Sequence, residues 1–92
     1  MKRAEAKHLS RVADLGCLLC EARGIHNTPA EIHHIRMGQG MQQRSEHWLT
    51  VPLCPEHHRG PHGIHGDRQA FKLAKVDELD LLAVVIERLS DA

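Results

Sequence analysis

A chain of 92 residues with zero net charge, one Phe, one Trp and no Tyr can bury only a modest core. No apolar run approaches the roughly 18 to 20 residues that a membrane-spanning helix needs. The charged N-terminus also lacks the apolar stretch of a secretory signal. We therefore expect one cytoplasmic domain over residues 1–92 that needs a further source of stability.

Cysteine and histidine are the unusual part of the composition, with three Cys and nine His in the chain. An odd number of Cys excludes a closed disulfide framework, and Cys together with many His favours metal binding in a reduced compartment. Zero net charge neither requires nor excludes a nucleic-acid partner, although free-standing DNA-binding domains are usually basic. Metal ligation is therefore the first chemistry to look for.

The first predicted element is a helix over residues 2–15. Ala6, Leu9 and Ala13 recur at spacings of three and four, which is typical of a helix with one apolar face. Gly16 follows at a position where helices commonly end. The basic residues on the outer surface of this helix form either a solvated face or a face that contacts phosphates.

Two half sites for one metal ion lie far apart in the chain. Cys17 and Cys20 have the C-x2-C spacing that lets both thiolates face the same point, and Cys54 and His57 form a C-x2-H pair. Together they predict a structural Zn²⁺ site of the Cys3His type, which would tie the first helix to the middle of the chain. A redox-active cysteine pair, or cysteines that only pack in the core, are the alternatives.

Two short strands are expected between these half sites. Residues 30–35 alternate apolar and polar side chains and end near the pair His33 and His34, and residues 45–53 carry the second apolar run. Residues 37–44 would form a long polar loop between the strands. Long loops are often functional, and a mobile connector is the alternative interpretation.

The last third of the chain predicts two helices. Gly and Pro between residues 58 and 66 should prevent a long helix there, and Asp67 and Asp77 should cap helices over residues 68–75 and 78–90. One face of the final helix is predicted to carry the apolar residues Leu79, Leu82, Ala83, Ile86 and Leu89. Further apolar residues on this helix either fill the core or form a homodimer surface.

The combined motifs resemble those of the HNH, or ββα-metal, endonucleases: C-x2-C, then His-His-Ile at residues 33–35, then Leu-Cys-x2-His-His at residues 53–58. The runs over residues 33–41 and 49–58 are similar to the phage Ref-type recombination enhancement nucleases and their small relatives. The resemblance implies an α+β fold. A small zinc-stabilised ββα-metal core over about residues 17–75 would be flanked by the N- and C-terminal helices.

The resemblance also implies roles for individual histidines. In such nucleases the first His-His pair supplies a metal ligand and a general base, which would be His33 and His34 here. His58, which follows the second half of the zinc site, would be another ligand of the catalytic metal ion. A last ligand is expected downstream, and His65 is preferred to His62 because it lies beyond the glycine turn and just before a helix.

The middle position of the family motif is often Asn and orients the base or the substrate. No Asn stands shortly before Cys54, and His47 is the nearest candidate for this role. The resemblance implies hydrolysis of DNA, with the scissile phosphate held by Arg36, Arg44 or Arg59. Because no Asp/Glu pair accompanies the histidines, one divalent cation such as Mg²⁺ or Mn²⁺ with a histidine base is favoured.

Partners follow from the same resemblance. A Ref-type protein would cleave DNA in connection with recombination, together with a host recombinase, in a bacterial or phage-infected cell. Two other functions fit the same residues. One is a non-catalytic zinc-stabilised DNA-binding module, and the other is an adaptor that binds a protein through the apolar last helix. The sequence alone leaves open whether the substrate is duplex, single-stranded or branched DNA, or RNA.

Overall fold

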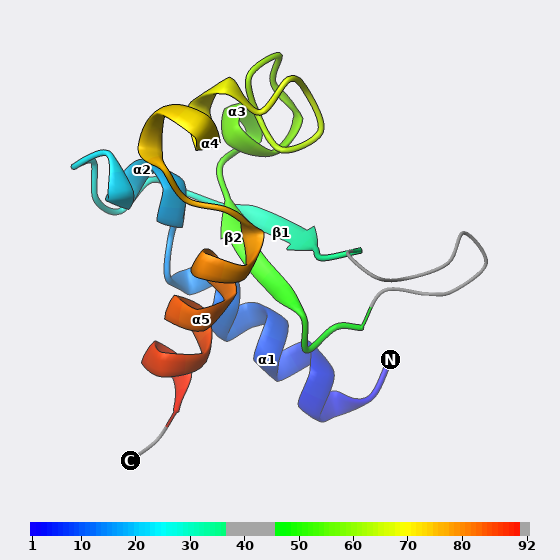
Figure 1. Ribbon diagram of the computed structural model, residues 1–92. Coiled ribbons are helices and arrows are strands. Elements are labelled where there is room, and N and C mark those ends of the chain that lie inside the picture. The colour runs from blue at the N-terminus through cyan, green and yellow to red at the C-terminus, as the bar shows by residue number, and fades with distance from the viewer. Residues whose placement is uncertain (37–45, 91–92) are drawn as a thin grey trace.

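The computed structural model describes residues 1–36 and 46–90, and it confirms a small α+β fold (Figure 1). A two-stranded sheet lies at the centre, and helices pack around it. The helices are α1 (Arg3–Asp14), α2 (Leu18–Ala22), α3 (Pro55–Arg59), α4 (Gln69–Ala74) and α5 (Glu78–Leu89), and the strands are β1 (Glu31–His34) and β2 (Thr50–Leu53). The predicted loop over residues 37–44 lies outside the described residues.

The strands β1 and β2 pair antiparallel, with Glu31 opposite Leu53 and His34 opposite Thr50. The second strand is shorter than the predicted span of residues 45–53. Within the described part of that span, residues 46–49 form a turn in which the amide of Leu49 donates to the carbonyl of Glu46 at 3.1 Å. The paired register ends at His34 and Thr50, and just beyond it the amide of Ile35 still donates to the carbonyl of Leu49 at 2.9 Å.

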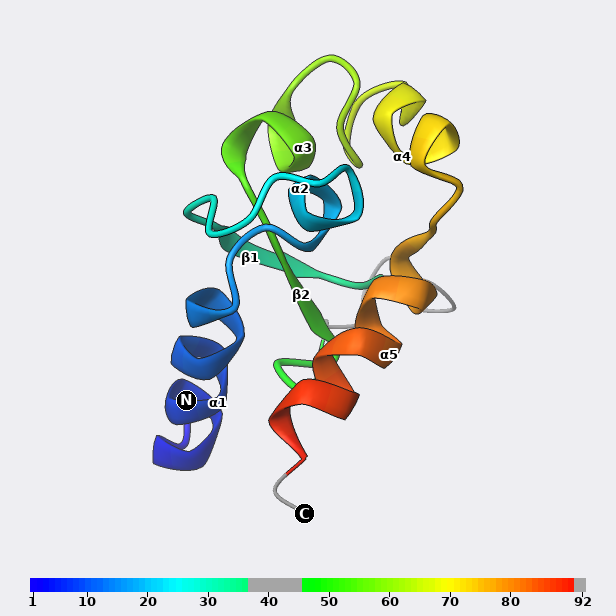
Figure 2. The same ribbon diagram turned by 90° about the vertical axis from the view of Figure 1, so that its left-hand side faces the viewer.

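The helices cover β2 from two ends of the molecule (Figure 2). At one end α1 and α5 lie side by side against β2, and at the other α2 and α3 pack on the sheet. Val12 of α1, Val51 and Leu53 of β2, and Val85 of α5 are almost completely buried where these elements meet. The strand β2 is thus the part of the chain around which the core forms.

The helix α5 begins at the predicted cap, since the carboxylate of Asp77 accepts from the amide of Asp80 at 2.9 Å. The apolar face predicted for it is only partly right, because of its five residues Leu82 alone is buried and Leu89 is half-buried. The structure buries Glu78, Leu81, Leu82 and Val85 and leaves Leu79, Ala83 and Ile86 exposed. Apolar side chains surround most of this helix, so their spacing alone does not define the buried side.

The start of α4 also differs from the prediction. The N-cap residue is Arg68, whose backbone is left-handed with a φ of 61°, and not Asp67. The Asp67 carboxylate instead accepts from the amide of Gln69 at 2.9 Å. Arg68 takes this conformation, which is uncommon for a residue other than glycine, between the glycine loop over residues 60–66 and the helix.

An ion pair and a hydrogen bond connect the last helix to earlier elements. The guanidinium of Arg88 on α5 donates twice to the carboxylate of Glu21 on α2, at 2.7 Å each. Arg11 of α1 donates to the carbonyl of Leu89 at 3.1 Å.

Among the described helices, none has the length and apolar character required to cross a bilayer.

Candidate metal sites

The first candidate site contains Cys17, Cys20, Cys54 and His57, all of them buried. The Nδ1 atom of His57 lies 3.5 Å from the Cys17 Sγ and 3.4 Å from each of the other two sulfurs. The sulfurs of Cys20 and Cys54 are 3.8 Å apart. Four ligand atoms therefore surround one point that a cation could occupy.

These separations fit tetrahedral zinc. A Zn²⁺ ion at about 2.3 Å from sulfur and about 2.0 Å from nitrogen would hold two sulfurs about 3.8 Å apart and a sulfur and a nitrogen about 3.5 Å apart. Burial raises the pKa of the Cys17 thiol to about 12, so a cation is needed to stabilise its thiolate. The distances and the donor set both suit a structural metal such as zinc.

Short helices present these ligands. Cys17 is the N-cap of α2, and its sulfur accepts from the amide of Cys20, at 3.4 Å, one turn later. Cys54 is likewise the N-cap of α3, and His57 follows within that helix. The sequence predicts a tight turn between Cys17 and Cys20, and the structure forms a helical turn instead, which gives the same convergence of the two sulfurs.

The second candidate site is a cluster of three histidines, His33, His58 and His65, whose ligand atoms lie within 4.8 Å of one another. Their ring centroids are 4.8 to 5.1 Å apart. The Nε2 atoms of His58 and His65 are 3.1 Å apart. Nitrogens bound at about 2.1 Å to one ion would be about 3.0 Å apart at right angles and about 3.4 Å apart at tetrahedral angles. The cluster therefore suits a second metal ion.

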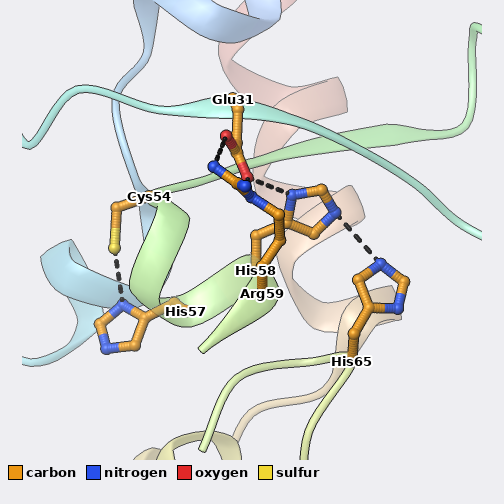
Figure 3. Close-up of polar contacts among 6 residues, drawn as sticks. All are labelled: Glu31, Cys54, His57, His58, Arg59 and His65. Carbon is orange, nitrogen blue, oxygen red and sulfur yellow. Dashed lines mark hydrogen bonds and ion pairs between the residues drawn. The ribbon is translucent and has the colours of Figure 1, made fainter. Parts of the chain in front are cut away.

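The helix α3 links the two sites, as Figure 3 shows: His57 points toward Cys54, and His58 points the other way toward His65. The glycine loop then folds back over α3. The amide of Ile64 donates to the carbonyl of His57 at 2.8 Å, and the amide of His65 donates to that of His58 at 3.2 Å. This return of the chain brings His65 against His58.

A side chain is not tolerated at Gly63 in this loop, because a Cβ there would lie 2.5 Å from the carbonyl oxygen of His57. His62, the alternative ligand considered from the sequence, lies outside the cluster. It is exposed and pairs with the Asp67 carboxylate at 3.1 Å. Of the two candidates, the structure brings only His65 to His33 and His58.

Two carboxylates contact ring nitrogens of histidines in this cluster. This corrects the expectation that no pair of acidic residues accompanies the histidines. The Nδ1 atom of His58 lies 2.7 Å from the Glu31 carboxylate, and the Nε2 atom of His33 lies 2.8 Å from that of Glu78. Figure 3 shows Glu31 between His58 and the guanidinium of Arg59. Such outer partners orient ligand histidines and increase their basicity.

The sequence carried a signal for only one of these carboxylates. Glu31 precedes His33 by two residues, and that spacing on a strand puts both on one face. Glu78 lies on a distant helix, directly after the capping residue, where an acidic side chain is ordinary.

Burial favours the neutral, metal-binding form of two of these imidazoles, those of His33 and His65. It lowers the pKa of His33 below the ordinary 6.5, against the raising effect of the Glu78 carboxylate. Burial also lowers the pKa of His65, and His58 adds to that effect. A neutral imidazole has a free lone pair, so both side chains are available as ligands near pH 7.

His34 and His47 form a pair beside the cluster. The Nε2 atom of His34 lies 3.1 Å from the Nδ1 atom of His47. The hydroxyl of Thr50, which is buried, donates to the His47 carbonyl at 3.0 Å. Burial lowers the pKa of His34, and the nearby His47 and Arg36 act in the same direction. The His34 imidazole is therefore mainly neutral at pH 7.

The predicted phosphate-binding arginines differ in their surroundings. Arg36 lines a cavity of about 320 Å³ next to His33 and His65. Arg59 instead pairs with Glu31 through two contacts of 2.7 and 3.1 Å, and Arg44 lies outside the described residues. Arg68, which sequence reasoning missed, lines the same cavity as Arg36.

The fold and these sites define a small α+β protein with a Cys3His site that could hold zinc and a three-histidine cluster beside it. Residues 2–90 match the family described as recombination enhancement, RecA-dependent nuclease, so the chain belongs to this family. No curated protein sequence matches the chain. The family name supports a nuclease that acts in recombination.

Proposed function

We propose that this protein is a metal-dependent HNH-type endonuclease that hydrolyses DNA phosphodiester bonds at the three-histidine cluster. One observation carries the proposal: His33, His58 and His65 converge in a chain that belongs to a nuclease family. The whole chain would then form a single HNH-like nuclease domain, with its core over about residues 17–75.

The two sites would divide the work. A Cys3His site that uses all four ligands has no open position for substrate, so its zinc would be structural. It would fix α3 against α2 and thereby set the position of His58, the residue next to the zinc ligand His57. The histidine cluster would hold a divalent cation such as Mg²⁺ or Mn²⁺ at the edge of the cavity.

Hydrolysis needs a base, a cation and a held phosphate. The cation would offset the charge that develops on the phosphate and on the leaving oxygen. His34 would accept the proton of the attacking water, since its lowered pKa keeps it neutral at pH 7. His47, at 3.1 Å from His34, would orient the base.

Arginines near the cluster would hold the DNA backbone. Arg36 and Arg68 line the cavity next to His33 and His65, so their guanidinium groups could grip the non-bridging phosphate oxygens. Arg59 is exposed beyond its pair with Glu31 and could still contact a neighbouring phosphate. Arg44 stays a sequence-based prediction.

A recombinase partner is proposed from the family name alone, which describes RecA-dependent nucleases. A homodimer through α5 also stays a prediction. Leu79 and Ile86 are exposed on that helix, as a dimer surface would require.

The test is a plasmid-nicking assay with Mg²⁺, Mn²⁺, Ni²⁺ or Zn²⁺, with and without a recombinase filament on single-stranded DNA. We expect the wild-type protein to nick DNA and His34→Ala to lose about 10²- to 10⁴-fold in rate, the usual contribution of a general base. His26→Ala is the matched control, because His26 is exposed and belongs to neither candidate metal site. DNA binding without cleavage under every condition would instead support a non-catalytic zinc-stabilised module.

A further inference from the structure

Glu78 is an unusual acidic residue, because it is only 7 % exposed and stands in the first turn of α5, among the core residues of that helix. A buried carboxylate is costly unless other groups pair with it. Its Oε2 atom lies 2.8 Å from the Nε2 atom of His33, and its Oε1 atom lies 3.8 Å from the guanidinium of Arg68. Both partners line the cavity beside the histidine cluster.

The contact with Glu78 determines which nitrogen of His33 is available. A carboxylate accepts a hydrogen bond, so the Nε2 atom of His33 carries the proton and Nδ1 carries the lone pair. That Nδ1 atom is buried and has no hydrogen-bond partner among the described residues. The His33 ring centroid lies 5.1 Å from that of His58 and 5.0 Å from that of His65. An unpartnered buried nitrogen among two other imidazoles fits a position that faces a cation.

We infer that Glu78 is a positioning residue of the histidine metal site. It accepts from the Nε2–H group of His33, fixes the tautomer whose Nδ1 atom binds the cation, and so makes the docking of α5 a part of that site. The inference rests on the proposed function, because it assumes that the cluster binds a divalent cation. It assigns a functional role to a helix that lies outside the recognisable motifs.

The arrangement around His58 supports this assignment. There the Nδ1 atom contacts the Glu31 carboxylate at 2.7 Å, and the Nε2 atom points to His65 at 3.1 Å (Figure 3). Each of these two histidines thus has one ring nitrogen on a carboxylate and one left for the cluster. An arginine stands beside each carboxylate as well, Arg59 by Glu31 and Arg68 by Glu78.

The experiment measures Ni²⁺ binding to the zinc-loaded protein by calorimetry. We expect one Ni²⁺ site in the wild type and an affinity about 10- to 100-fold weaker in Glu78→Gln, the usual cost of losing an outer partner of a ligand histidine. Zinc content should stay unchanged. Glu87→Gln is the matched control, because it removes an exposed carboxylate from the same helix and should bind Ni²⁺ as the wild type does.

Glu78→Asp covers the case in which the Gln variant fails to fold, since it keeps the charge but withdraws the carboxylate by about 1.5 Å, one carbon–carbon bond. It too should bind Ni²⁺ more weakly, with a far-UV circular dichroism spectrum like that of the wild type. In a double-mutant cycle, Glu78→Gln should cost nothing further once His33→Ala is present.

Two results would overturn the inference alone. One is wild-type Ni²⁺ affinity in a folded Glu78 variant, and the other is an additive loss in the His33→Ala background. A wild-type protein that binds no Ni²⁺ beyond its zinc would overturn the proposed metal site itself, and the inference with it.

Discussion

The Cys3His site should decide whether the chain folds, and Cys17→Ser tests this directly. Domains have about 0.05 to 0.15 kcal/mol of stability per residue, which for 92 residues amounts to about 5 to 14 kcal/mol. A structural zinc ion contributes about 10 to 16 kcal/mol of binding free energy to folding. The binding free energy of the ion is thus about as large as the whole free energy of unfolding. Loss of the ion should therefore remove most or all of the stability of the fold.

The structure gives a reason for the size of this effect. The sulfur of Cys17 contacts His57 at 3.5 Å, and the site joins α2 to α3 across 40 positions of the chain. The remaining core is small, and its largest fully buried side chains are aliphatic rather than aromatic. Without the ion, nothing binds the Cys and His side chains of α2 and α3 to one another. Each of these helices is too short to be stable by itself.

We expect Cys17→Ser to give an unfolded circular dichroism spectrum and less than one zinc per chain by elemental analysis. Removing zinc from the wild type with a chelator should unfold it reversibly, and adding zinc back should restore it. His26→Ala should keep both its spectrum and its zinc. A Cys17→Ser protein that stayed folded, with one zinc and an unchanged melting temperature, would refute a structural role for the site.

Two further predictions concern the elements that support the sites. Gly63→Ala would place a Cβ 2.5 Å from the carbonyl oxygen of His57 in α3. Urea unfolding should therefore show a loss of about 1 to 3 kcal/mol or more in the free energy of unfolding. Calorimetry should show weaker Ni²⁺ binding at the histidine cluster. The hydrogen bonds from Arg88 lower the pKa of Glu21. Their stabilisation, about 1 kcal/mol or less for this partly exposed pair, is therefore present above pH 4.5 and fades as the pH falls through the lowered pKa. Arg88→Met should remove this part of the acid dependence in melting curves, and an unchanged dependence would contradict it.

The local parts of the protein were accessible from the sequence. The helix over Arg3–Asp14 lies within the predicted residues 2–15, and Asp77 caps α5 as expected. Both signals depend on residues within a few positions of one another. The four Cys3His residues could be paired from their spacing, because C-x2-C and C-x2-H each bring two ligand atoms together within one turn.

Spacing failed where the chain offered several equivalent choices. Apolar residues surround α5, so the pattern favoured a face with Leu79 and Ile86, which are exposed, over the face with Val85, which is buried. His62 and His65 were both plausible ligands, and only the fold of the glycine loop over α3 separates them.

The sequence by itself determined the chemistry of this protein: the Cys and His that can bind metals, and the helices and strands that carry most of them. Only the tertiary structure decided that Glu78 supports one of those ligands. Glu78 reaches His33 from 45 positions away, and no local pattern encodes that contact. It exists because the docking of α5 on β2 turns one carboxylate inward, where burial without a partner would be too costly.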